Sequence, residues 1–215
     1  MNTAKLSARL GIIIIGLFFL TTNIFAQATD WKTEKTEDGK ITVTSKISKR
    51  TDENYNEVQL VEYVATTTAN VSLQNCISVM KDISKHKEIL NEEVSEMVKI
   101  ISDNEWLIYY YFDAPWPIPN SDCVTKMNFF EDPSNRLATF TLTAEPSMYD
   151  IKDVKRVTYY NVTYVFKDLG DGKIEMTSTA KLSPIIQAPE WIVREFFPNG
   201  PARYLERLLS LAKSA

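Results

Sequence analysis

The chain has 215 residues, of which 44% are hydrophobic, and its 24 Lys and Arg against 28 Asp and Glu give a formal net charge of −4. This length favours one domain with its own core, and the acidic balance argues against nucleic acid as a partner. Two cysteines are too few for a disulfide framework. No His pair or Cys pair has the spacing of a metal site, so we expect no metal and no cofactor.

The N-terminal segment, residues 1–26, has the pattern of a secretory signal peptide. Lys5 and Arg9 precede an apolar run over residues 10–20, which is short for a bilayer span of about 20 residues. Ala26 then offers a small residue for cleavage before Gln27. The pattern predicts an exported protein, periplasmic or secreted, with an uncleaved membrane anchor as the alternative.

Residues 27–40 are polar and charged, and we expect them to form a leader before a single domain over residues 41–215. Alternating apolar and polar residues predict an antiparallel pair of strands near 41–46 and 58–66. The period then changes, because apolar residues recur at intervals of three and four over residues 73–83. This spacing predicts one amphipathic helix.

Six further runs have the composition and alternation of strands, and turn residues separate them. The tripeptide Gly170-Asp171-Gly172 is the strongest of these turns and is typical of a hairpin. The predicted strands are residues 94–102, 105–112, 123–130, 137–144, 154–167 and 174–183.

A final helix is predicted over residues 189–213, and Pro198 and Pro201 in its middle require a kink or a break. Two strands, a helix, six strands and a long helix indicate an α+β protein of the helix-grip kind. In that fold a curved antiparallel sheet wraps around the C-terminal helix.

The strand over residues 106–112 is apolar or aromatic on both faces, although an antiparallel sheet commonly exposes one face to water. One interpretation is a dense core on one side with ordinary packing on the other. The alternative is that tyrosines present their rings and hydroxyl groups to a concave pocket for a lipid or sterol. Periodicity alone leaves both interpretations open.

The segment over residues 108–122, IYYYFDAPWPIPNSD, resembles the START (steroidogenic-acute-regulatory-related lipid transfer) family. That family has a tyrosine-rich strand, then Pro-aromatic-Pro, then Arg-Asp at the next strand. Residues 154–157 (VKRV) and 189–193 (PEWIV) match two further family motifs in the same order. The resemblance covers residues 41–211.

The resemblance implies a helix-grip fold with an internal tunnel that binds, or binds and transfers, a lipid or other hydrophobic molecule. Ser121 stands where the family has Arg, and this departure favours a neutral ligand. If Tyr111 takes the position of an inward acidic residue in some relatives, alternation directs Tyr109 inward too. The residues expected to line the pocket are Tyr109, Tyr111, Trp116, Ser121, Cys123, Phe140, Arg156, Trp191 and Phe196.

Two other functions stay open at this point. A cyclase-like or hydrolase-like enzyme could use the same cavity, but the single histidine, His86, is expected on the surface and no catalytic constellation is evident. A protein-interaction module would instead have a filled core. We expect a monomer that makes transient membrane contact. We also expect Cys76 and Cys123 to be free thiols, with a disulfide between them as the alternative.

Overall fold

The computed structural model describes residues 30–114, 118–150 and 152–215. Its elements in chain order are β1 (Lys32–Lys35), β2 (Thr42–Thr51), β3 (Glu57–Asn70), α1 (Leu73–Lys81), η1 (Ile83–Lys85), α2 (His86–Leu90), β4 (Val94–Ser102), β5 (Glu105–Phe112), β6 (Ser121–Asp132), β7 (Leu137–Ala144), β8 (Lys155–Arg156), β9 (Tyr160–Gly170), β10 (Lys173–Leu182), α3 (Glu190–Arg194) and α4 (Asn199–Lys213).

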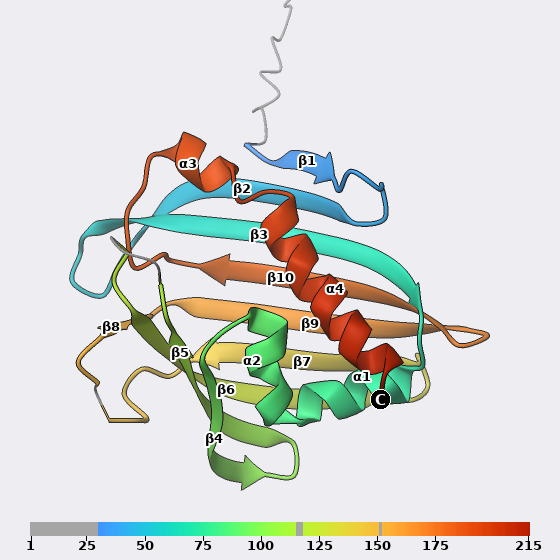
Figure 1. Cartoon of the computed structure of the whole chain (residues 1–215). Coiled ribbons are helices and arrows are strands. Elements are labelled where there is room, and N and C mark those ends of the chain that lie inside the picture. The colour runs from blue at the N-terminus through green and yellow to red at the C-terminus, as the bar shows by residue number, and fades with distance from the viewer. Residues whose placement is uncertain (1–29, 115–117, 151) are drawn as a thin grey trace, which may run out of the picture.

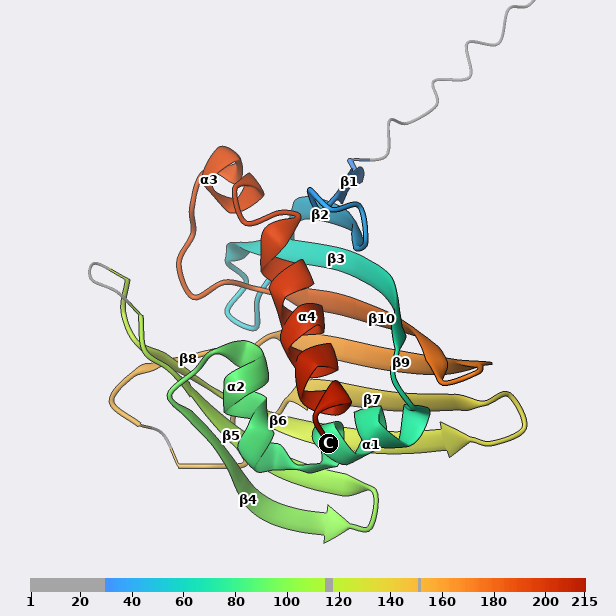
Figure 2. The same cartoon turned by 45° about the vertical axis from the view of Figure 1, so that its right-hand side comes forward.

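The strands form a single sheet in the order β1-β2-β3-β10-β9-β7-β6-β5-β4, and the short β8 pairs in parallel with β6 off this path. All the neighbouring pairs along the path are antiparallel. Helix α4 crosses one face of this sheet, in front of β3, β10 and β9 (Figure 1). The β4–β5 end of the sheet curves toward the side of the helices (Figure 2). The fold is therefore the predicted α+β helix-grip arrangement.

The core lies between the inner face of the sheet and the helices. Leu205, Leu208 and Ala212 on α4 are fully buried, since they recur at the helical spacing and face the sheet. On β3 and β10 the buried residues alternate instead, as expected for strands with one covered face. Helices α1 and α2 both contact α4 and close the lower end of this layer (Figure 2).

Helix boundaries follow from local chemistry. Ser72 caps the N-terminus of α1, because its side-chain oxygen accepts a hydrogen bond of 3.1 Å from the backbone N–H of Asn75. The predicted break in the C-terminal helix is confirmed: α3 ends at Arg194 and α4 begins after Pro198. None of the helices in the described part of the chain has the length and hydrophobicity needed to cross a bilayer.

Three predictions about local structure were wrong. The polar leader contains β1, an exposed edge strand that pairs with β2 and has no buried face to produce an alternating pattern. The predicted strand over residues 154–167 is two strands, β8 and β9, which have different partners. His86 is not on the surface: it begins α2 and is 3% exposed, because this short helix packs against the core.

Both cysteines are free and buried, Cys76 on α1 and Cys123 on β6. Burial raises the pKa of each thiol to about 12, so neither is a reactive thiolate near neutral pH. They serve as small apolar residues of the core, and the alternative of a disulfide between them is wrong.

Candidate functional site

A cavity of about 320 Å³ lies between the inner face of the sheet and the helices. Its volume is near the lower end of the range of small-molecule pockets. The wall is mainly apolar and aromatic, and it combines residues from β3, α2, β5, β9, β10, α3 and α4. The lining residues are Val61, Tyr63, Leu90, Glu92, Phe112, Tyr160, Tyr164, Leu182, Pro184, Ile186, Ala188, Val193, Phe196 and Tyr204.

Four phenols provide most of the polar groups in the wall. Tyr63, Tyr160 and Tyr164 come from the inner faces of β3 and β9, and Tyr204 comes from α4. Burial is the main cause that raises the pKa of each of these phenols above its ordinary value. They therefore stay neutral and can donate or accept hydrogen bonds within a largely apolar space.

The carboxyl group in the wall belongs to Glu92, in the connection between α2 and β4. Burial raises the pKa of this carboxyl to about 7, with Glu93 adding to the shift and Arg207 opposing it. No lysine, arginine or histidine lines the cavity within the part of the chain that the structure describes. The cavity can thus hold an apolar molecule and offers a carboxyl group and phenols to any polar end.

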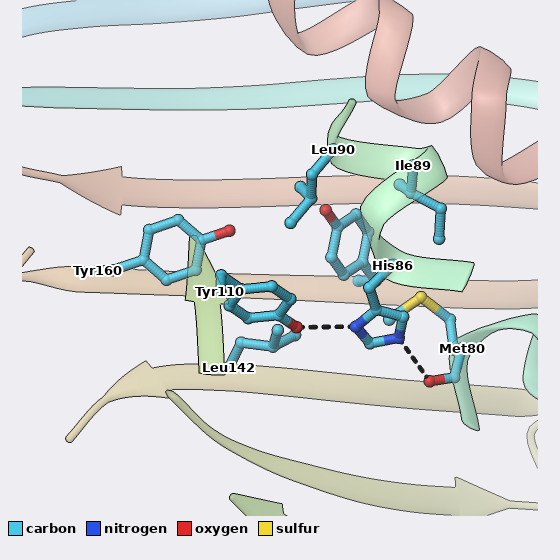
Figure 3. Close-up of a pocket in the computed structure, with 8 residues that line it drawn as sticks. Met80, His86, Ile89, Leu90, Tyr110, Leu142 and Tyr160 are labelled. Carbon is cyan, nitrogen blue, oxygen red and sulfur yellow. Dashed lines mark hydrogen bonds between the residues drawn. The ribbon is translucent and has the colours of Figure 1, made fainter. Parts of the chain in front are cut away.

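A much smaller void of about 10 Å³, roughly the space of one water molecule, lies beside the main cavity. The two share Leu90, Tyr160 and Tyr164 in their walls. Figure 3 shows how His86 and Tyr110 meet at this place, with the phenol of Tyr110 at 2.7 Å from Nδ1 of His86. Both side chains are buried and bonded to each other, and they form part of the wall of this small void.

Helix α3 and the residues after it form the outer wall. The guanidinium group of Arg194 donates a hydrogen bond of 3.3 Å to the Ser45 hydroxyl on β2, which attaches the helix to the sheet. Phe196 lines the cavity and its ring lies directly over Gly200. A Cβ atom at that position would overlap the ring, so glycine permits this close approach.

The structure brings one of the predicted pocket residues, Phe196, into the lining of the main cavity. Phe140 is fully buried between the rings of Phe129 and Phe166 and belongs to the packed core. Trp191 on α3 is 69% exposed and does not line the cavity. The prediction for Trp116 concerns a position outside the described residues.

The inward orientation predicted for Tyr109 and Tyr111 is wrong. Tyr110 belongs to the main core, whereas Tyr109 packs with Tyr111 in a separate cluster on the other face of the sheet. Strand register explains this, because Cys123 faces the core and pairs with Tyr110. The run of aromatic residues in β5 has no alternation from which the inward face could be deduced.

Ser121 and Cys123 lie on the inner face of β6, the face predicted for them, and both are buried. Neither lines the main cavity, whereas Phe112, the partner of Ser121 on β5, stands in its wall.

Arg156 is not a pocket residue. Its guanidinium group makes two hydrogen bonds to the Asp122 carboxylate, of 2.9 and 2.7 Å. It also donates to the backbone carbonyls of Pro146, Tyr149 and Asp150. Asp122 pairs with Tyr111 on β5 and so lies on the face away from the cavity. The arginine therefore fixes the loop before β8 to the sheet, which is a structural role.

Sequence reasoning missed several residues of the wall. Tyr63 lies at an alternating buried position of β3, so its inward direction could have been found from the period of that strand. Glu92 lies in a polar connection between two elements, and nothing in its neighbourhood in the sequence distinguishes it from the exposed Glu93.

Within the described ranges no group of three His, Cys, Asp or Glu side chains could hold a metal ion. The single histidine has both ring nitrogens in hydrogen bonds, to the Tyr110 hydroxyl and the Met80 carbonyl oxygen. Both nitrogens are thereby engaged within the protein, and the ring does not line the main cavity.

Comparison with solved structures identifies the fold. The chain is similar to a STAR-related lipid transfer protein of Xanthomonas axonopodis, with a TM-score of 0.68, 20% identity, and coverage of 86% of this chain and 99% of that one. The human StarD13 lipid transfer and protein localization domain gives a TM-score of 0.66 at 15% identity, over 84% of this chain and 88% of that one. Human StAR-related lipid transfer protein 5 gives a TM-score of 0.64 at 15% identity, over 88% of this chain and 89% of that one.

No protein-family model matches the sequence, and no curated protein is significantly similar to it. Identities of 15 to 20% over nearly whole domains show the architecture rather than the ligand. The TM-scores of 0.64 to 0.68 extend over 84 to 88% of this chain, which includes the sheet and the C-terminal helix across it. The chain therefore has the helix-grip fold of the STAR-related lipid transfer domains.

Proposed function

We propose that this protein binds a lipid or similarly hydrophobic small molecule in the cavity between its sheet and α4. The observation that carries the proposal is the cavity itself, about 320 Å³ in volume and lined mainly by apolar and tyrosine side chains. An empty space of that size inside a small domain lowers its stability, because the side chains around it lack the packing contacts of a filled core. Binding of an apolar molecule would replace those contacts.

The similar solved structures support the same function, because the three proteins compared above are named for lipid transfer. In this chain the cavity lies between the curved sheet and the terminal helix. Binding is the part of that activity that the cavity supports directly. Transfer between membranes would also require a route for the ligand and contact with a bilayer.

Helix α3 supports such transient contact. Trp191 and Ile192 expose large apolar side chains on it, and Val193 on the same helix lines the cavity. An exposed tryptophan beside a pocket wall is the kind of residue that enters the interface of a membrane. We place the ligand's exit route at α3, and expect the protein to act as a monomer in solution.

The two other candidate functions have less support. An enzyme would need a base or nucleophile in contact with the ligand, and the described wall offers Glu92 and phenols without an orienting partner. A protein-interaction module with a filled core does not agree with the cavity. We therefore favour binding without chemistry.

We further propose that the protein is exported. The support comes from the sequence, where Lys5 and Arg9 precede an apolar run and Ala26 provides a cleavage position. N-terminal sequencing of the protein purified from a periplasmic fraction would test this. A chain that begins at Gln27 is expected, and an intact Met1 in the membrane fraction would contradict it.

Native mass spectrometry of the protein, purified without detergent, tests the binding function. We expect a stoichiometric hydrophobic molecule, which organic extraction would release for identification. A protein that is folded and empty, and that takes up no apolar fluorescent probe after delipidation, would contradict the proposal.

A further inference from the structure

We infer that Glu92 determines which polar group the cavity accepts, and that it selects an amphiphile whose polar end is a hydrogen-bond donor, an amine or a hydroxyl, over one that ends in an anion. The inference rests on the proposed function, since it concerns the same cavity. It begins from the composition of the wall, in which Glu92 is the acidic residue among apolar side chains and phenols.

The position of Glu92 is fixed by the end of a helix. Asn91 adopts the left-handed conformation with φ of 59° and ends α2. The backbone N–H of Glu92 then donates a hydrogen bond of 2.9 Å to the carbonyl oxygen of Lys87. This cap turns the chain from α2 toward β4 and holds the Glu92 side chain in the cavity wall.

The carboxylate has hydrogen-bonding capacity left for a ligand. Among the groups that shift its pKa, burial comes first, then the charges of Arg207 and Glu93, and no hydrogen bond contributes within the described chain. The guanidinium group of Arg207 is directed instead to the backbone carbonyl oxygen of Ile89. A half-buried carboxylate without a hydrogen-bond partner is costly, and a donor group on the ligand would relieve that cost.

The charges around Glu92 define the preference. Arg207 and Tyr204 face it from α4, and Glu93 adjoins it on the same connection. Arg207 is not itself among the lining residues, and the described lining includes no cation, so a fatty acid or phosphate group would meet the Glu92 carboxylate in a wall with no cation to pair with the anion. An ammonium or hydroxyl group would instead find an acceptor in Glu92, surrounded by neutral phenols.

The volume agrees with a small amphiphile. About 320 Å³ is close to the smallest size of ordinary ligand pockets, which suits a single-chain or compact ring molecule.

The test compares three ligands with the same twelve-carbon chain, 1-dodecanol, dodecylamine and dodecanoic acid. Each is titrated, below its critical micelle concentration, into delipidated protein at about pH 8, where Glu92 is ionised. Dodecylamine and dodecanol are expected to bind at least about tenfold more tightly than the acid. Binding of the amine should weaken by about tenfold on going from pH 8 to pH 6, because a carboxyl of pKa about 7 is then mostly protonated.

Two variants with the same change in net charge separate the site from general electrostatics. Glu92→Gln is expected to reduce the preference for the amine over the acid to less than about threefold and to abolish the pH dependence. Glu93→Gln alters the exposed neighbour and is expected to keep both the preference and a pH dependence, the latter displaced toward lower pH because the charge of Glu93 adds to the raised pKa of Glu92. If Glu92→Gln behaves as the wild type, or if the acid binds as tightly as the amine, the inference is overturned and the proposed function stands. If none of the three ligands binds, both are overturned.

Discussion

Nδ1 of the His86 imidazole and the hydroxyl oxygen of Tyr110 lie 2.7 Å apart in the wall of the small void beside the cavity (Figure 3). Nε2 of the same ring is 2.9 Å from the carbonyl oxygen of Met80, which can only accept a hydrogen bond. Nε2 therefore carries the proton, and Nδ1 accepts the proton of Tyr110. Burial lowers the pKa of His86, which favours this neutral ring.

Tyr110→Phe is expected to destabilise the fold, because it leaves Nδ1 of a buried histidine without a donor. The free energy of unfolding should fall by about 1–3 kcal/mol, measured by chemical denaturation. The matched control is Tyr109→Phe, which removes the neighbouring phenol on the opposite face of the sheet. Equal losses for the two variants would contradict the role assigned to the His86–Tyr110 pair.

Arg156→Ala is expected to weaken stability without changing ligand selectivity. The Arg156 and Asp122 side chains are only 9% and 1% exposed, so removal of the arginine leaves a buried carboxylate unpaired. The expected loss is about 3–5 kcal/mol in the free energy of unfolding. Where the variant still folds, its relative affinities for matched apolar ligands should equal those of the wild type. A change in those relative affinities would contradict the structural role assigned to Arg156 and indicate that it contacts the ligand.

Two aromatic residues near α3 are expected to have different effects. Phe196 lines the cavity, so Phe196→Ala should speed ligand dissociation roughly tenfold, as measured by stopped-flow displacement of a fluorescent probe. Trp191 points to solvent, so Trp191→Ala should leave dissociation in solution unchanged and reduce association with vesicles. Faster dissociation from Trp191→Ala in solution would show that our assignment of the wall is wrong.

Glu92 is expected to make stability depend on pH. Its pKa is about 7 in the folded protein and about 4.3 in the unfolded chain, so the folded state binds more protons between these values. Its contribution to stability is therefore present below about pH 4.3 and is lost as the pH rises through 7. Glu92→Gln should become more stable relative to the wild type from pH 5 to pH 8, as measured by thermal unfolding without ligand. A constant difference between the two proteins over this interval would contradict the buried state of the carboxyl.

The sequence predicted most of the architecture because its periods are distinct. Apolar residues at intervals of three and four predicted the helix that begins at Leu73. Turn residues predicted the bounds of β4, β5 and β7 as observed, and Pro198 predicted the break before α4. Polar β1 was missed, since an exposed edge strand carries no hydrophobic pattern.

The cavity wall was much harder to predict. The aromatic residues of β5 are apolar on both faces of the strand, so the sequence does not show which of them face the core. Tyr110 faces the core, and Tyr109 and Tyr111 face away, because Tyr110 pairs with Cys123 in β6. Phe196 was found, but Glu92 and Tyr204 enter the wall only through tertiary packing of α2 and α4. Such contacts have no period in the sequence.

Filling the cavity with a large side chain tests whether this space binds a hydrophobic molecule. Val61 lines the cavity on β3, and Val64 lies on the opposite face of the same strand, so Val61→Trp and Val64→Trp place the same large side chain inside and outside. Binding of an apolar fluorescent probe to the delipidated proteins is the measurement, with circular dichroism to confirm folding. We expect Val64→Trp to bind the probe as the wild type does and Val61→Trp to lose binding. Equal binding by two folded variants would contradict binding in this cavity.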